Sequence, residues 1–417
     1  MTAPSPAETL ARPLPLKRGP PLPNRLAKAS MSEQLAERDG TPGDRLVQLY
    51  RRWSTSGAGL LISGNVMVDP RALVERANVV VEDGRHLPVL RRWAEVAQSQ
   101  GAQLWMQINH PGRQSPRALS KQPVAPSAVG IKGAGQFAVP RALTAPEILE
   151  IVERFGRTAA VAREAGWSGV QIHGAHGYLV SQFLSPRANL RDDEWGGDPV
   201  RRRRFLLEVL RSVRRHAGAD FPLGLKLNSA DFQRGGFTEE ESAAVLKELE
   251  AEGVDLVELS GGTYEAAAMF LGTNAAESTR RREAYFADFA ERARSRTRVP
   301  LMVTGGFRTA AGMAEAVGSG ALDVVGMARP LALEPDLPAR LLSGAATAST
   351  AERRRVGLRL LDLVAEGDWY LHQIHRMADG LEPNPRRGNW TSALAGLYRA
   401  VTGTRPRRNA PAAAGTA

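Results

Sequence analysis

Residues 169–186 read GVQIHGAHGYLVSQFLSP, a short apolar run that ends in two histidines three positions apart. Each histidine is followed by a glycine, and Tyr178 lies two positions after the second histidine. The run 169–174 is short and apolar, which favours a buried strand. On their own these residues allow three interpretations: a buried strand that carries imidazoles, half of a metal site, or hydrogen-bond and proton donors around a substrate. The place of the stretch in the fold has to decide between them.

Similar apolar runs recur along the chain, separated by longer segments with helical periodicity. The candidate strands are 24–31, 60–68, 103–109, 169–174, 223–228, 254–261, 300–306 and 322–328. Alternation of this kind is typical of repeated βα units. Eight units in about 310 residues predict an α/β fold, a (β/α)8 TIM barrel with loop insertions and a C-terminal helical extension. A doubly wound sheet is disfavoured because the glycine fingerprint expected after its first strand is missing.

The segments between the candidate strands carry helix start and stop signals. Thr144 can cap a helix that has Pro146 in its first turn and ends near Gly166. Thr238 is a second candidate cap, and Glu241 completes a capping box with it. These signals support helices that return the chain from one strand to the next.

The chain divides into four parts by composition. Residues 1–23 predict a small hairpin that plugs the barrel bottom, 24–342 the barrel, 343–403 a helical extension, and 404–417 a disordered tail. Two connections, 110–143 and 261–282, are too long for simple turns. Both follow strands, so we expect them at the C-terminal mouth of the barrel as lids or binding loops.

Composition excludes several classes of function. Cysteine is absent, which rules out disulfides, thiolate zinc sites, cysteine-held iron–sulfur clusters and a cysteine nucleophile. The first 23 residues contain seven prolines and no apolar signal region, and no apolar run approaches the roughly 20 residues that span a membrane. We therefore expect a cytoplasmic protein without membrane contact.

The net charge of +11 raises the question of nucleic-acid binding. Nearly all the positive charge is arginine, 49 residues against six lysines, and it is dispersed over predicted helices such as 201–218 beside acidic residues. We therefore expect a small-molecule substrate and no nucleic acid. A homo-oligomer is compatible with the sequence.

The barrel prediction places His173 at the C-terminal end of the fourth strand, with His176 and Tyr178 in the loop above it. In TIM barrels the chemistry takes place at these strand ends. Other strand ends meet at the same mouth. They carry Ser30, Met31, Ser32, Asn65, Gln107, Asn109, His110, Lys226, Gly305, Gly306, Ala328 and Arg329. This set is polar and cationic and has no carboxylate at its centre, which weighs against a metal site.

The ends of the last two strands suggest a phosphate group. The sequences VTGGF and GMARP place backbone N–H groups and Arg329 where barrels commonly bind phosphate. Gly305 and Gly306 allow close approach of the main chain. Each signal is weak alone, but together they predict a phosphorylated cofactor.

Several motifs in order along residues 14–342 match a known family. The most specific is IHGAHGYLVSQFLSPRANLRDDEWGGD; others are LPNRLAKASM, LWMQINHPGRQS, LKLNSADFQRGGFTEEES, VTGGFR and VGMARPL. The chain resembles the old yellow enzyme family, the FMN-containing NAD(P)H-dependent ene-reductases. The resemblance implies an FMN-binding barrel and, as co-substrate, NADH or NADPH.

The resemblance also implies roles for individual residues. Ala29, Ser30, Met31 and Ser32 would follow one edge of the isoalloxazine ring, with Ser32 near N5 and O4. Asn65 would touch the same edge, and Gln107 would bond the pyrimidine ring. Lys226 would face N1 and O2. The phosphate would be held by Gly305, Gly306, Ala328 and Arg329. His173 and His176 would hydrogen-bond the activating group of the substrate, and Tyr178 would be the proton donor.

Physical chemistry supports the same assignments. A fixed cation near N1 and O2 favours reduced flavin, and Lys226 provides one. Two imidazole donors can stabilise charge on a carbonyl oxygen, where one donor contributes roughly 3 kcal/mol. A phenol can protonate carbon as a general acid. The expected reaction is hydride transfer from NAD(P)H through FMN to an electron-poor alkene, quinone or nitro compound. Two alternatives stay open: a flavin-barrel enzyme that modifies RNA, and a flavin-binding protein without turnover.

The chain departs from the family pattern at four of these positions. Proline is common where this chain has Ser30, and cysteine or threonine is common at Ser32. Arginine is common at Lys226, so this chain keeps the charge but loses the bidentate fork. Asn65 replaces a smaller residue. We expect these changes to alter the flavin potential and the shape of the pocket.

Overall fold

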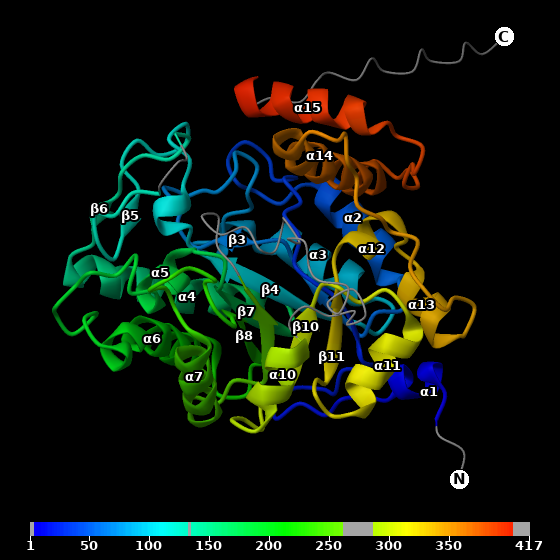
Figure 1. Cartoon of the computed structure of the whole chain (residues 1–417), viewed down its shortest axis with the longest axis horizontal. Helices are drawn as coiled ribbons and strands as arrows, with labels where there is room; N and C mark the ends of the chain where they lie inside the picture. Colours follow the sequence, from blue (N-terminus) through cyan, green and yellow to red (C-terminus); the bar gives the residue numbers. More distant parts are fainter. Residues whose placement is uncertain (1–3, 132–134, 262–286, 403–417) are drawn as a thin grey trace.

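The computed structural model describes residues 4–131, 135–261 and 287–402 (Figure 1). Within these residues eight parallel strands close into a barrel, because the last strand pairs with the first. The strands are β1 (Leu26–Lys28), β2 (Leu60–Ile62), β4 (Gln103–Asn109), β7 (Gly169–Gly174), β8 (Leu223–Asn228), β9 (Leu256–Ser260), β10 (Leu301–Thr304) and β11 (Val324–Met327). The predicted TIM barrel is confirmed: β4, β7 and β8 have the predicted bounds, and the other five strands are shorter than the apolar runs that predicted them.

One predicted strand is broken. The run 60–68 forms β2 and a separate short strand β3 (Val66–Met67), which pairs with the C-terminal end of β4. The break falls at Gly64, whose backbone N–H donates to the carboxylate of Glu33 at 3.0 Å instead of to a strand. A side-chain acceptor thus replaces a strand partner at this point and interrupts the strand. The apolar pattern of the sequence does not reveal this interruption.

Helices surround the strands (Figure 1). In the described ranges, the helices between barrel strands are α2 (Asp44–Ser54), α3 (Leu87–Gln98), α4 (Ala145–Glu164), α5 (Leu179–Leu184), α6 (Pro199–Ala217), α7 (Glu239–Ala251), α10 (Ala287–Arg294) and α11 (Ala310–Gly318). Short helices η1 (Gly84–His86) and η2 (Gly112–Gln114) precede α3 and follow β4. The predicted caps are confirmed, since Thr144 and Thr238 each form a complete capping box, with Glu147 and Glu241.

The N-terminal segment lies under the barrel. After α1 (Pro6–Ala11), Leu14 and Leu22 exchange two backbone hydrogen bonds of 2.9 Å. Both leucines join the apolar cluster inside the barrel, beside Trp105. Arg18 binds the backbone oxygen of Gly253 at 2.8 Å, just before β9 begins. The segment therefore covers the N-terminal ends of the strands, opposite the candidate site.

The loop after β4 contains the strands β5 (Val124–Ala125) and β6 (Arg141–Ala142), which pair in parallel. The second long connection, 261–282, lies almost wholly outside the described residues, as does the predicted tail 404–417. No helix in the described ranges has both the length and the apolar character needed to cross a membrane.

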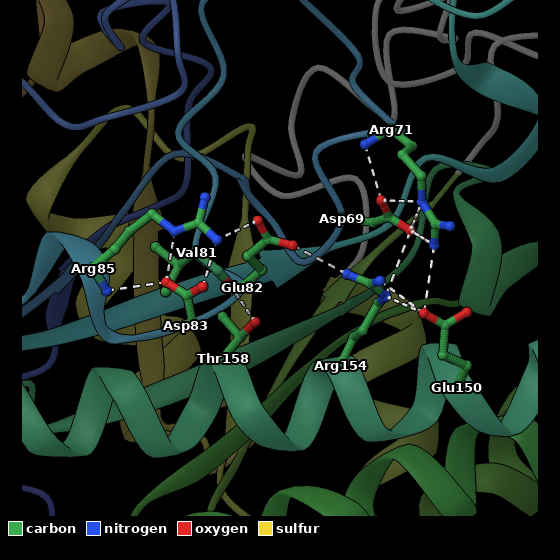
Figure 2. A network of polar contacts seen from close by, with 9 residues as sticks. All are labelled: Asp69, Arg71, Val81, Glu82, Asp83, Arg85, Glu150, Arg154 and Thr158. Atoms are coloured by element: carbon green, nitrogen blue, oxygen red, sulfur yellow. Dashed lines mark hydrogen bonds and ion pairs between the residues drawn. The ribbon is translucent and has the colours of Figure 1, made fainter.

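The segment after β3 is tied to α4 by charged side chains (Figure 2). Arg154 on α4 approaches Glu150 at 2.7 Å, Glu82 at 3.4 Å and Asp69 at 3.7 Å. Asp69 is also bound by Arg71 at 2.7 Å. This network fixes residues 69–82, which lie beside the barrel mouth.

The C-terminal extension is helical, as predicted. It follows α12 (Arg329–Leu333) and α13 (Leu337–Leu342) and consists of α14 (Arg359–Ala378) and α15 (Asn389–Thr402). In Figure 1 both helices lie at the top of the view, with α14 next to α2 and α12 and α15 outermost. Trp369, Tyr370 and Ile374 of α14 belong to the same apolar core as the barrel helices.

Candidate active site

The structure brings the two predicted histidines and the tyrosine together. The ring centroids of His173 and Tyr178 are 4.7 Å apart, and those of His173 and His176 are 5.1 Å apart. His173 is the penultimate residue of β7 and shares the inward face with Gln171, and Tyr178 precedes the first turn of α5. His176 has φ +61°, a left-handed conformation uncommon outside glycine. The three side chains are only 5–7% exposed.

A hydrogen bond determines the tautomer of His173, and burial keeps both rings neutral. The backbone N–H of Ala175 donates to Nδ1 of His173 at 3.3 Å, so the neutral ring carries its proton on Nε2. Nε2 of His176 is 2.7 Å from Oγ of Ser260. Burial, and then the charge of Lys226, lowers the pKa of both histidines well below the usual value. Both rings are therefore neutral near pH 7.

A chain of polar side chains crosses the barrel beneath the histidines. Ser30 donates to Gln107 at 2.8 Å, and Gln107 donates to Gln171 at 2.7 Å. Gln171 in turn donates to Glu258 at 2.9 Å, and the ammonium of Lys226 lies 2.9 Å from the same carboxylate. Predicted residues from β1, β4 and β8 thus belong to one network.

The expectation of a centre without carboxylates is wrong. Glu258 on β9 is fully buried and lies beside Lys226, and Thr304 also donates to it at 2.6 Å. The cation of Lys226 is thus shared with a carboxylate, because a lone buried ammonium would be costly. Glu258 and Gln171 are the main residues that the sequence analysis missed. The available signal was strand alternation, since Glu258 shares its face with Leu256 and Ser260.

The residues predicted to line one edge of the isoalloxazine ring, here called the flavin-edge residues, follow β1 and β2. They are Ala29, Ser30, Met31, Ser32 and Asn65. Ser32 donates to Glu75 at 2.5 Å and lies 3.4 Å from Oδ1 of Asn65. Ala29 still belongs to the barrel, because its N–H donates to Met327 on β11. Met31 packs against the outer apolar core. The structure therefore places the four predicted residues 29–32 and Asn65 at one side of the mouth, with Glu75 as an unpredicted neighbour.

The residues predicted to hold phosphate directly follow the neighbouring strands β10 and β11. Gly305 and Gly306 have φ +100° and +93°, and both are exposed. A Cβ added to Gly305 would meet no atom within 4 Å, so the main chain is open to a ligand. Ala328 and Arg329 follow β11, and Arg329 pairs with Glu366 of α14 at 2.7 Å. That pairing partly neutralises the predicted phosphate ligand.

The side chain of Asn109 indicates whether these residues fit FMN, because its amide is buried and lacks a partner in the described ranges. Its side chain is fully buried, and among the described residues neither atom of its amide has a hydrogen-bond partner. Strand alternation puts it on the inward face of β4, one step above Gln107. A buried amide needs a partner, and a ring rich in donors and acceptors provides one. With the uncharged amides, the cations of Lys226 and Arg329 and the two glycines, the site fits FMN.

In the described part of the chain, no third ligand lies beside the histidine pair to complete a metal site. Among the described residues, no three His, Asp or Glu side chains come together in a way that could hold an ion. Glu258 reaches Lys226 and not the histidines. The geometry instead groups neutral donors with a phenol.

Comparison with known proteins identifies the family of the chain. Residues 9–348 match the NADH:flavin oxidoreductase / NADH oxidase family. A protein of Hypocrea jecorina (strain QM6a), described as NADH-dependent flavin oxidoreductase iliE, is 39% identical over 352 residues, 78% of this chain and 87% of that protein. A protein of the same description from Neonectria sp. (strain DH2) is 37% identical over 394 residues. That match covers 87% of this chain, which spans only about half (51%) of the relative.

Solved structures give the same result. Morphinone reductase in complex with tetrahydroNAD matches with a TM-score of 0.68 and 28% identity, covering 81% of this chain and 91% of that one. A 2-naphthoyl-CoA reductase matches with a TM-score of 0.80 and 25% identity, covering 89% and 58%. The family match and these relatives show that the chain belongs to the NADH:flavin oxidoreductase / NADH oxidase family, FMN-dependent oxidoreductases that include relatives of old yellow enzyme.

Proposed function

We propose that this protein transfers hydride from NADH or NADPH to an electron-poor alkene, quinone or nitro compound, with Tyr178 as the proton donor. FMN, when bound, would supply the two-electron redox chemistry that links the nicotinamide to the acceptor. The carrying observation is that Tyr178, His173 and His176 lie in ring contact at the end of β7. Residues 29–32, Asn65, Gln107, Lys226 and the glycines would hold the cofactor below them.

The two histidines would orient and polarise the acceptor. When hydride reaches the β-carbon of an enone, negative charge grows on the carbonyl oxygen. The Nε2–H of His173 is a preorganised donor for that oxygen, because Ala175 fixes the ring by bonding Nδ1. His176 is braced by Ser260 and, through its backbone N–H, by Asn228 at 3.1 Å. Neutral rings can donate without first losing or gaining a proton.

Tyr178 would complete the reduction. The hydride forms a C–H bond at the β-carbon, and the α-carbon then takes the phenolic proton, which solvent later restores to the oxygen of Tyr178. General acids of this kind contribute about 10²- to 10⁴-fold to a rate. The edge contact with His173 holds the phenol over the mouth of the barrel. Lys226, shared with Glu258, would provide a moderated positive charge near the pyrimidine end.

The test separates the two half-reactions. FMN-loaded protein is mixed anaerobically with NADH or NADPH, and the loss and return of the flavin absorbance are followed by stopped flow. We expect Tyr178→Phe to leave reduction by nicotinamide within about twofold and to slow reoxidation by an enone by about 10²-fold or more. Reoxidation by a quinone, which needs no proton on carbon, should be slowed much less.

Tyr398→Phe on α15 is the matched control, since it removes a phenol remote from β7. Equal damage to both half-reactions by Tyr178→Phe would contradict the acid role. Wild-type protein that bleaches with nicotinamide but is never reoxidised by an acceptor would instead favour a flavin-binding protein without turnover.

A further inference from the structure

The C-terminal helix α14 contacts both sides of the proposed cofactor site. One contact reaches the segment after β1 through His375, and the other reaches Arg329 after β11 through Glu366. We propose that α14 is a built-in positioning element of the FMN site, with His375 and Glu366 as its two positioning residues. This inference rests on the proposed use of FMN and assigns a role to the extension 343–403.

The His375 contact supports the flavin-edge segment. Nε2 of His375 donates to the backbone oxygen of Glu33 at 2.7 Å, across 342 residues of sequence. Glu33 directly follows Ser32, so the bond fixes the main chain that carries the predicted flavin-edge residues. His375 itself is buried, and an imidazole facing a carbonyl must carry its proton on that nitrogen.

Glu33 extends this support to the second flavin-edge segment. Its carboxylate accepts from the N–H of Gly64 at 3.0 Å and from the hydroxyl of Tyr50 at 2.5 Å. Lys28, which is fully buried, lies 3.5 Å from the same oxygen. Gly64 directly precedes Asn65. One residue held by α14 therefore fixes both chain segments on that side of the mouth.

The Glu366 contact acts at the phosphate side. Oε1 of Glu366 is 2.7 Å from Nη1 of Arg329, whose side chain is partly exposed while that of Glu366 is mostly buried. A buried carboxylate bound to a half-exposed guanidinium selects one orientation for it. The remaining N–H groups of Arg329 are then presented in a defined direction, which lowers the ordering cost when phosphate binds.

The helix is firmly enough attached to act as a support. Trp369 and Ile374 pack in the main apolar core. Arg52 of α2 binds Glu382, just beyond α14, with two hydrogen bonds of 3.0 and 3.1 Å. Arg45 of α2 pairs with Asp379 at 2.7 Å. These contacts dock α14 without touching the flavin-edge segments.

The experiment measures flavin affinity directly. Apoprotein is titrated with FMN and with riboflavin, which lacks the phosphate, and binding is followed by flavin fluorescence. His375→Met keeps apolar volume but removes the donor, and we expect it to weaken both flavins by the same factor, roughly five- to tenfold. His375→Gln keeps an N–H donor and should stay within about threefold of wild type. Glu366→Ala should weaken FMN several-fold and leave riboflavin unchanged.

Asp379→Asn is the control for a general loosening of α14. It removes a docking ion pair of the same helix, so it should lower the melting temperature without changing either flavin affinity. If His375→Met behaves like Asp379→Asn, or if Glu366→Ala strengthens FMN binding, the positioning role is overturned. If wild-type protein binds neither flavin, the proposed function falls together with this inference, whereas normal binding by every variant overturns only the inference.

Discussion

His173 and His176 stay neutral because burial and Lys226 disfavour their charged forms. In an unfolded chain histidine binds its proton below about pH 6.5. Between that pH and the lowered pKa of the folded rings, the unfolded state takes up more protons. The contribution of the two neutral rings to the free energy of unfolding is therefore complete above about pH 6.5. It is lost as the pH falls toward the pKa of the rings in the folded state.

This difference predicts acid sensitivity of the apoprotein. Each ring should reduce the free energy of unfolding by up to about 1.4 kcal/mol per pH unit below about pH 6.5. Urea unfolding at several pH values measures the slope, and the double variant His173→Asn/His176→Asn should show a shallower one. His110, whose pKa burial lowers to about 4, remains in the variant and keeps part of the slope. Identical slopes would show that the rings are not held neutral.

The role of Glu258 cannot be recognised from its local sequence. Its neighbours Val257 and Leu259 are apolar, so the pattern places Glu258 on a strand but does not show what its carboxylate binds. Its importance comes from Lys226, Gln171 and Thr304, which approach from three other strands. The same is true of Glu75, whose partner Ser32 is 43 residues away. Pairings between distant segments follow from barrel closure and not from local pattern.

At the scale of elements, residues 69–82 depend on α4 for their position. Replacing Arg154 with Met would remove the ion pairs to Glu150, Glu82 and Asp69 (Figure 2). Because Asp69 is buried, we expect a loss of unfolding free energy on the order of 1–3 kcal/mol, measured by urea denaturation. Glu164→Gln on the same helix removes an exposed pair with Arg91 and should cost less than about 1 kcal/mol. Equal losses would mean that the network adds nothing beyond surface charge.

Helices and strands were predictable to different degrees. Thr144 and Thr238 mark their helices because a cap is a local hydrogen-bond pattern. The break between β2 and β3 was not predictable, since it depends on Glu33 accepting the N–H of Gly64. The extension was expected to be helical, but its contacts with Glu33 and Arg329 cross more than 30 residues of sequence.

At the scale of the whole molecule, many of the arginines in the described ranges form ion pairs, and the net charge of +11 is the excess of cations over carboxylates. Arginines of α6 illustrate this, because Arg202, Arg203 and Arg211 face Glu241, Glu248 and Glu252 of α7 and its end. Paired cations present a weaker field to a phosphate backbone than an open basic face does.

A tRNA-binding assay follows from this charge arrangement. In a salt titration of filter binding, we expect any retention at low salt to disappear by physiological salt, because only counterion release would drive it. We also expect the rate of flavin reduction by nicotinamide to stay the same when tRNA is added. Binding that survives physiological salt would revive the RNA-modifying alternative.

The sequence by itself determined the βα order, the barrel, the capped helices and the family, because these follow from local periodicity and contiguous motifs. It also placed His173, His176 and Tyr178 at one strand end, since they lie within six residues of each other. Only the tertiary structure decided that Lys226 shares its charge with Glu258, that Gly64 leaves the sheet for Glu33, and that α14 reaches both sides of the mouth. Those facts depend on which buried groups meet across the closed barrel, and each buried charge or carbonyl takes the partner that packing brings to it.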